Sequence, residues 1–224
     1  MKFISFAEAG LRFCGKRVAI VGSAPSVLKN PAGFIDGHDV VVRVNNYKLT
    51  RETGSRTDVY YSFFGGSIKK TVDELKCDGV TLCWCKCPNA KPIESAWHEK
   101  MNKVNGIDFR YIYSLREKFW FCDTFIPTVS RFLAPFEALK QHIPSTGFSA
   151  IWDIITCRPR EIYLTGFDFF ESRIHNVNEP WREGDPNDPI GHRPDLELQW
   201  LRNHWATLPM RGDRKVLDLI GVDA

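Results

Sequence analysis

The feature that most constrains the fold is a set of continuous apolar runs, rich in β-branched residues, that end in glycine or in polar residues. Strands buried on both faces, as in parallel sheets, have this continuous pattern instead of an alternating one. Five runs predict strands, at 16–22, 38–47, 54–64, 79–87 and 160–170. Two weaker runs, at 108–114 and 214–221, predict one further short strand each.

Segments with helical features separate these runs, at 23–31, 67–76, 144–158 and 193–208. Strands that alternate with helices predict a parallel sheet with helices on both faces. We therefore predict an α/β, Rossmann-like fold with a mostly parallel sheet. The length of 224 residues fits a single domain over 1–224.

The bulk composition limits the classes of function. A net charge of +3 is too small to favour a nucleic-acid partner. No run of about 18 apolar residues occurs, and Glu8 and Arg12 interrupt the start, so we expect neither a membrane span nor a signal peptide, and at most peripheral membrane association. Seven scattered cysteines, an odd number, favour a reducing compartment, and we expect a cytoplasmic protein. The oligomeric state stays open.

Cys83, Cys85 and Cys87 alternate along a predicted strand and allow two interpretations. Metal sites usually space their thiols by two or more residues. Alternate strand residues share one face of a sheet, where cysteine behaves as a small apolar residue. We favour the second interpretation and expect neither a metal nor a cofactor.

Residues 171–191 are rich in proline, asparagine, aspartate and glycine and have no apolar period. Loops of this length are usually functional lids or disordered linkers. We expect a C-terminal lid or acceptor loop here, with Arg173, His175 and Arg182 as possible phosphate or lid residues. Trp181 lies in the same segment.

The loop after the first strand, "GSAPS", matches neither the Walker A nor the Gly-x-Gly-x-x-Gly pattern. In open α/β sheets ligands bind beyond the carboxyl ends of the strands, and four polar stretches converge there. Their candidate ligand-binding residues are Gly22, Ser23, Ala24, Ser26, Asn45, Asn46, Ser145, Thr146, Gly147, Gly166 and Asp168. Ser145 or Thr146 can cap the next helix, whose N–H groups and dipole favour an anion.

Together these segments resemble sialyltransferases. "VAIVGSAPSVL", "IDGHDVVVRVNNY" and "GSRTDVYY" are similar to the large sialyl motif of the animal enzymes of glycosyltransferase family 29, and "IPSTGFSAIWDIITCRPREIYLTGFDFF" resembles their small motif. "EIYLTGFDFF" and "IGH" at 190–192 are equally similar to bacterial family 42. His192 and Glu197 also fit the H-x₄-E pattern of the animal family.

This resemblance implies a sialyltransferase-type variant of the GT-A fold and an inverting, metal-independent transfer of sialic acid, or a related acidic sugar, from a CMP-sugar to a glycan hydroxyl. His192 falls on the families' catalytic base. Asn45 matches the asparagine after the second strand, and residues 145–147 match the segment that holds the nucleotide. Gly166 and Asp168 match the strand end beside it. No Asp-x-Asp metal pair precedes the nucleotide loops.

Two residues depart from the families' pattern: Ser23 stands where relatives carry asparagine, and Phe170 stands where the bacterial enzymes carry tyrosine. A CMP-Kdo or other CMP-nonulosonate transferase, or a degenerate nucleotide- or glycan-binding relative without turnover, therefore stays open. An enzyme using NAD or a methyl donor is a further alternative. The missing glycine fingerprint and the missing acidic residue after a second strand count against it.

Each candidate also has a structural interpretation. His192 could be a solvated loop residue, and Asn45 with Asn46 could only form a turn. The segment 145–147 could be only a helix cap, and Asp168 could only support its loop.

The tryptophans and Glu197 are also ambiguous. Trp181, Trp200 and Trp205 could line a sugar site or pack on an amphipathic face. Glu197 could orient the imidazole of His192 if the backbone between them turns back.

Overall fold

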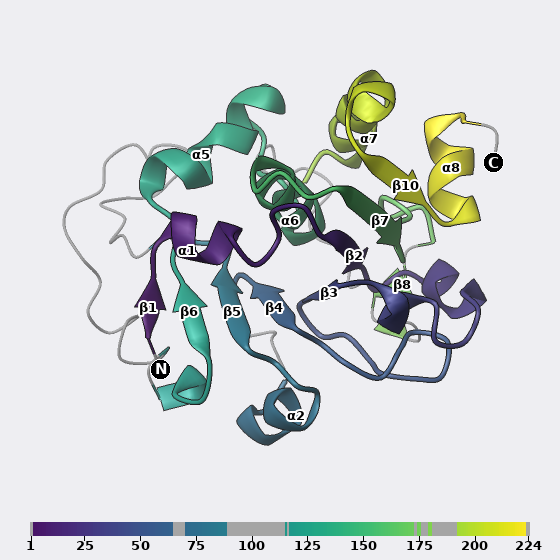
Figure 1. Ribbon diagram of the computed structural model, residues 1–224. Helices are drawn as coiled ribbons and strands as arrows, with labels where there is room; N and C mark the ends of the chain where they lie inside the picture. The colour runs from purple at the N-terminus through teal and green to yellow at the C-terminus, as the bar shows by residue number, and fades with distance from the viewer. Residues whose placement is uncertain are drawn as a thin grey trace.

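A computed structural model describes residues 2–64, 70–88, 115, 117–172, 174–175, 179–180 and 192–222. Its main sheet has eight strands in the order β1-β6-β5-β4-β3-β2-β7-β10, and every neighbouring pair is parallel. The strands are β1 Phe3–Ile4, β2 Arg17–Val21, β3 Val40–Val44, β4 Val59–Ser62, β5 Leu82–Cys85, β6 Asp123–Phe125, β7 Glu161–Thr165 and β10 Met210–Gly212. This confirms the predicted Rossmann-like α/β class (Figure 1).

Helices cover both faces of this sheet (Figure 1). They are α1 Phe6–Gly10, α2 Val72–Cys77, α5 Val129–Ala138, α6 Thr146–Thr156, α7 Pro194–His204 and α8 Arg214–Ile220, with short 3₁₀ helices η1 Pro25–Lys29, η2 Ile35–Gly37 and η3 Trp205–Thr207. Successive strand residues point to opposite faces. Accordingly, Val18 and Ile20 of β2 pack with α6, α7 and α8, whereas Ala19 and Val21 pack with η1 and η2.

The order of the strands reverses at β2. From β2 the chain passes outward through β3, β4 and β5 to β6, and then returns to place β7 on the other side of β2. In open α/β sheets such a switch point opens a crevice beyond the carboxyl ends of the strands. Gly22 and Gly166 end the two strands there, with Gly22 N–H donating to the Thr165 carbonyl at 2.8 Å.

A side-chain network holds the end of β7 in place. Asp213 accepts from the Thr165 hydroxyl at 2.7 Å and from the Gly166 N–H at 3.1 Å. Asn30 donates to the same Thr165 hydroxyl at 2.8 Å. These bonds hold Gly166 in a left-handed conformation, φ 72°, which glycine adopts without a steric cost.

The segment 214–221 is a helix, so the prediction of a strand there was wrong. Asp213 caps α8 by accepting from the Val216 N–H at 2.9 Å, and Gly221 ends it at φ 81°. Val216 and Ile220, four residues apart, are both buried on one side of the helix. An apolar run this short has no clear period, so the capping residues at its two ends indicate the helix better than the run itself does.

Other expectations have mixed outcomes. The segment 23–31 forms the 3₁₀ helix η1, and the helix expected at 144–158 is α6. The sequence did not predict β1 and β6, whose two and three residues are too few to show a period. The strand expected at 108–114 lies outside the described residues.

Most of the expected lid at 171–191 also lies outside the described residues. Two short strands within it, β8 Ile174–His175 and β9 Glu179–Pro180, pair antiparallel in a separate sheet. Among the helices that the structure describes, none has the length and apolar character needed to cross a bilayer.

Candidate functional site

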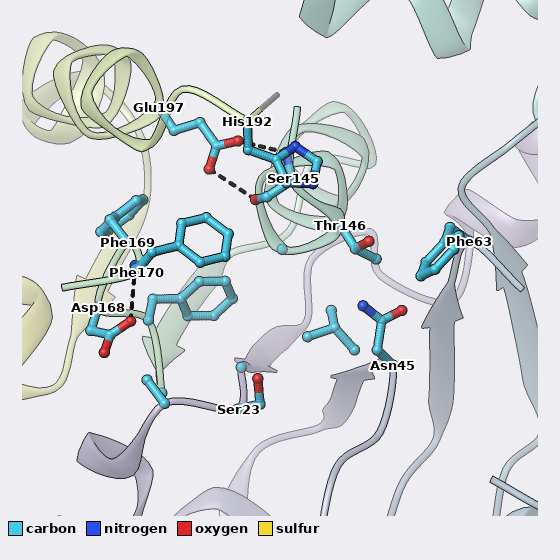
Figure 2. Close-up of a pocket in the computed structure, with 16 residues that line it drawn as sticks. Ser23, Asn45, Phe63, Ser145, Thr146, Asp168, Phe169, Phe170, His192 and Glu197 are labelled. Atoms are coloured by element: carbon cyan, nitrogen blue, oxygen red, sulfur yellow. Dashed lines mark hydrogen bonds between the residues drawn. The ribbon is translucent and has the colours of Figure 1, made fainter. Parts of the chain in front are cut away.

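A cavity of about 270 Å³ lies at the switch point, beyond the carboxyl ends of β2, β3 and β7 (Figure 2). Its lining residues are Gly22, Ser23, Ala24, Val44, Asn45, Phe63, Ser145, Thr146, Gly147, Gly166, Phe167, Asp168, Phe169, Phe170, His192 and Glu197. Residues from segments more than 100 positions apart in the sequence thus share one cavity.

The cavity brings together most of the candidates expected from sequence. Those that line it are Gly22, Ser23, Ala24, Asn45, Ser145, Thr146, Gly147, Gly166, Asp168 and His192. Ser26, which is buried in η1, and Asn46 are not among the lining residues. The side chains of Arg173, His175 and Arg182 lie outside the described part of the chain.

Asn45 follows β3 in a left-handed conformation, φ 50°. Its N–H donates to the Tyr61 carbonyl at 3.0 Å, and its side-chain oxygen accepts from the Ser62 hydroxyl at 3.2 Å. The turn considered from sequence is therefore real, and Asn45 lines the cavity as well (Figure 2). With the amide oxygen bonded to Ser62, the donor side of the amide is left for a ligand.

Ser145 caps α6, since its hydroxyl accepts from the Phe148 N–H at 3.1 Å. The first N–H groups of a helix have no partner within the helix and carry partial positive charge. Thr146 and Gly147, the first residues of α6, line the cavity. A Cβ on Gly147 would lie 2.6 Å from the Phe167 ring, so glycine lets that ring close the wall.

Glu197 contacts the same cap. Its carboxylate accepts from the Ser145 N–H at 2.5 Å and from the Ser145 hydroxyl at 2.8 Å (Figure 2). Burial raises the pKa of Glu197 to about 7, although the bonds from Ser145 oppose this shift. From the sequence, Glu197 could orient His192 if the backbone between them turned back. In the structure its two oxygens bond Ser145 instead.

His192 lies at the mouth of the cavity with an exposed side chain. Its Nδ1 is 3.0 Å from the Ile143 carbonyl oxygen. Because a carbonyl only accepts, Nδ1 carries the proton, and in the neutral ring the lone pair is on Nε2. The Phe170 ring lies parallel to the imidazole, with centroids 6.1 Å apart and planes at 7°.

Four phenylalanines line the cavity, at positions 63, 167, 169 and 170. Asp168 holds the backbone at one of them, Phe170, because its carboxylate accepts from the Phe170 N–H and the Ser172 N–H, each at 3.1 Å. Asp168 therefore supports its loop and also lines the cavity. Sequence reasoning did not identify Phe63, Phe167 or Phe169 as site residues, since aromatic residues at strand ends are also typical of a core.

Other residues considered from sequence lie elsewhere. Trp205 is buried in the core, and Trp200 packs against Phe148 and Trp152. Cys83 and Cys85 are buried residues of β5. Among the described residues, no group of three histidine, cysteine or acidic side chains is placed to hold a metal ion. Trp181 lies outside the described residues.

Comparisons with known proteins find similarity only at the level of structure. No protein-family model matches the sequence, and no curated protein matches it. The sialyltransferase CstII from Campylobacter jejuni, in complex with the substrate analogue CMP-3FNeuAc, has a TM-score of 0.59 at 14% identity, covering 91% of this chain and 84% of that chain. The monofunctional α-2,3-sialyltransferase Cst-I from Campylobacter jejuni has a TM-score of 0.57 at 13% identity, covering 89% of this chain and 76% of that chain. A mammalian sialyltransferase in complex with Gal-β-1-3GalNAc-ortho-nitrophenol has a TM-score of 0.51 at 14% identity, covering 89% of this chain and 69% of that chain.

The sheet and its cavity define a Rossmann-like α/β protein with a candidate ligand site at the switch point. More particularly, the chain has a sialyltransferase-like fold, as the sequence resemblance implied. Identities near 14% establish this likeness for the fold alone.

Proposed function

We propose that the protein is a glycosyltransferase that moves sialic acid, or a related acidic sugar, from a CMP-sugar to a glycan hydroxyl. The observation that carries this proposal is one cavity that joins the N-terminus of α6, Asn45 and His192 at the switch point. Solved relatives in fold contain CMP or a CMP-sugar analogue, which supports the same donor class here.

In the proposed reaction, Nε2 of His192 takes the proton from the acceptor hydroxyl. The acceptor oxygen attacks the anomeric carbon as the bond between that carbon and the phosphate oxygen breaks, so the configuration inverts. CMP leaves with the electron pair of the broken bond. The N–H groups of Thr146 and Gly147 are suited to this anion, because preorganised donors stabilise charge as it develops. We propose that these donors make the transfer independent of a metal.

Calorimetry with CMP tests the donor class, with NAD as the comparison ligand. We expect CMP to bind and NAD not to bind. A protein that binds no CMP would overturn the proposal.

Release of CMP from CMP-sialic acid in the presence of a glycan then separates a transferase from a binding protein. A mass-spectrometric screen with CMP-sialic acid, CMP-Kdo and UDP-sugars identifies the donor. Turnover of CMP-Kdo alone would favour the alternative of a Kdo transferase. CMP binding without any turnover would favour the degenerate relative, for which Ser23 and Phe170 are the specific reasons.

Thr146→Val removes the side-chain hydroxyl and keeps the backbone N–H. It is expected to weaken CMP binding by roughly ten- to a hundredfold if that hydroxyl also bonds the phosphate, since a hydrogen bond to a charged group is worth about 1.5–3 kcal/mol. Thr156→Val, at the other end of α6 and outside the cavity, serves as the matched control. Titration calorimetry measures both variants. An unchanged affinity in Thr146→Val would count against a direct contact with the phosphate.

A further inference from the structure

Two buried, oppositely charged side chains meet at a single peptide bond in front of α6. Lys86, which follows β5, is 7% exposed and donates from Nζ to the Pro144 carbonyl at 2.6 Å. Glu197 of α7 is 1% exposed and accepts from the Ser145 N–H at 2.5 Å. The Pro144 carbonyl and the Ser145 N–H are the two ends of one peptide group, so that group is held from both sides.

A third bond fixes the cap itself. The Ser145 hydroxyl has one proton, which it donates to Glu197 at 2.8 Å, and it accepts from the Phe148 N–H at 3.1 Å. Glu197 therefore sets the direction of the hydroxyl that starts α6. Because the 144–145 peptide cannot rotate without breaking these bonds, the residues that follow it, Thr146 and Gly147, keep their place in the lining of the cavity.

The charges around this arrangement come from several elements. Burial raises the pKa of Glu197 to about 7, Lys86 from the β5 side lowers it, and Asp195 on the same helix raises it. Burial lowers the pKa of Lys86, against the effects of Cys87 and Glu197. His192 precedes α7 and bonds the neighbouring Ile143 carbonyl.

Burial of charge is expensive for the fold. Because the pKa of Glu197 in the folded protein lies above the ordinary 4.5, its stability contribution falls as pH rises from about 4.5 towards 7. A buried charge costs free energy unless it is paired or hydrogen-bonded, and here each charge bonds one end of the same peptide group. Because burial of these two charged side chains costs stability, their presence indicates that they serve the site more than the stability of the fold.

We propose that Lys86 and Glu197 are positioning residues that clamp the 144–145 peptide and hold the start of α6 ready for the phosphate of a CMP-sugar. This inference rests on the proposed function, because that function supplies the ligand, a CMP-sugar. The two residues act through Ser145 and need not touch the donor.

The test measures CMP affinity by calorimetry at pH 6 and pH 8 in wild type, Glu197→Gln and Lys86→Met. A protonated carboxyl loses an acceptor, so wild-type positioning weakens as pH falls through about 7. At pH 8 we expect Glu197→Gln to bind CMP about tenfold more weakly than wild type, and at pH 6 the two should be nearly equal. We expect Lys86→Met to bind CMP more weakly than wild type at both pH values. The CMP phosphate is common to wild type and all variants, so the difference from wild type isolates Glu197.

Asp195→Asn is the matched control, because Asp195 lies on the same helix with an exposed side chain that pairs with Arg193. It should keep a pH-dependent affinity, with the midpoint moved to lower pH because Asp195 raises the pKa of Glu197. A Glu197→Gln variant with wild-type affinity at pH 8 would overturn the clamp. The same holds for an Asp195→Asn variant that abolishes the pH dependence.

A ligand-free measurement separates the clamp from the proposed function. In ¹⁵N NMR, the amide of Ser145 should titrate with a midpoint near the pKa of Glu197, about 7, in wild type. It should titrate at a lower midpoint in Asp195→Asn, because Asp195 raises that pKa, and stay constant in Glu197→Gln. If the amide titrates while CMP does not bind, the proposed function fails and the clamp remains a property of the fold. If Glu197→Gln does not fold, the wild-type and Asp195→Asn titrations decide, and a constant Ser145 amide in wild type overturns the proposal.

Discussion

His192→Ala is expected to lower the rate of sugar transfer by about 10²–10⁴-fold while CMP affinity changes less than about threefold. The physical reason is that a general base stabilises the transition state and adds little to binding of the nucleotide. His192 is suited to this role because its Nδ1 bonds the Ile143 carbonyl at 3.0 Å, which leaves Nε2 free of a proton in the neutral ring. Steady-state kinetics with CMP-sialic acid and calorimetry with CMP measure the two effects.

His204→Ala is the matched control for this prediction. His204 ends α7, bonds the Trp200 carbonyl at 2.7 Å and is not among the residues that line the cavity. We expect it to retain transfer. Near-normal transfer by His192→Ala would refute its role as base, and equal losses in kcat and CMP affinity would indicate a binding role instead.

Gly22→Ala should produce the largest loss of stability among single substitutions at the site. A Cβ on Gly22 would lie 2.2 Å from the Gly166 carbonyl oxygen and 2.9 Å from its carbon. Both contacts are with backbone, so β2 and β7 must move apart at the switch point. Overpacking of this kind costs about 3 kcal/mol. Chemical denaturation measures the free energy of unfolding.

Gly37→Ala is the control, because a Cβ there meets nothing within 4 Å and the backbone is not in the left-handed region. We expect its free energy of unfolding to lie within about 1 kcal/mol of wild type. We also expect Gly22→Ala to lose CMP binding, since Gly22 and Gly166 both line the cavity. Comparable stability in the two variants would be inconsistent with the close approach of these strand ends.

Local patterns predicted the parts of the fold that depend on neighbouring residues. The apolar run before Gly22 predicted β2, and Ser145 predicted the start of α6. A strand buried on both faces and a capped helix both leave a signature in consecutive residues. The apolar pattern gave the wrong prediction at 214–221, which forms a helix that Asp213 caps and Gly221 ends.

The sequence also predicted many of the residues that line the cavity. Strand ends of a parallel sheet share one edge, so polar residues at 22–26, 45–46 and 166–168 were expected to converge. The structure adds the aromatic wall at Phe63 and Phe167, for which the sequence has no distinct signal. It also shows that Glu197, which the sequence allowed beside His192, accepts two hydrogen bonds from Ser145.

By itself the sequence determined the class of fold, the residues that end its central strands and the cap that starts α6, because each depends on residues close together in the chain. Only the tertiary structure decided how the cap is held. Lys86 lies 58 residues from Pro144, and Glu197 lies 52 residues from Ser145. These contacts form because the strand order and the packing of α7 bring the end of β5 and the start of α6 together, and no local pattern encodes that placement.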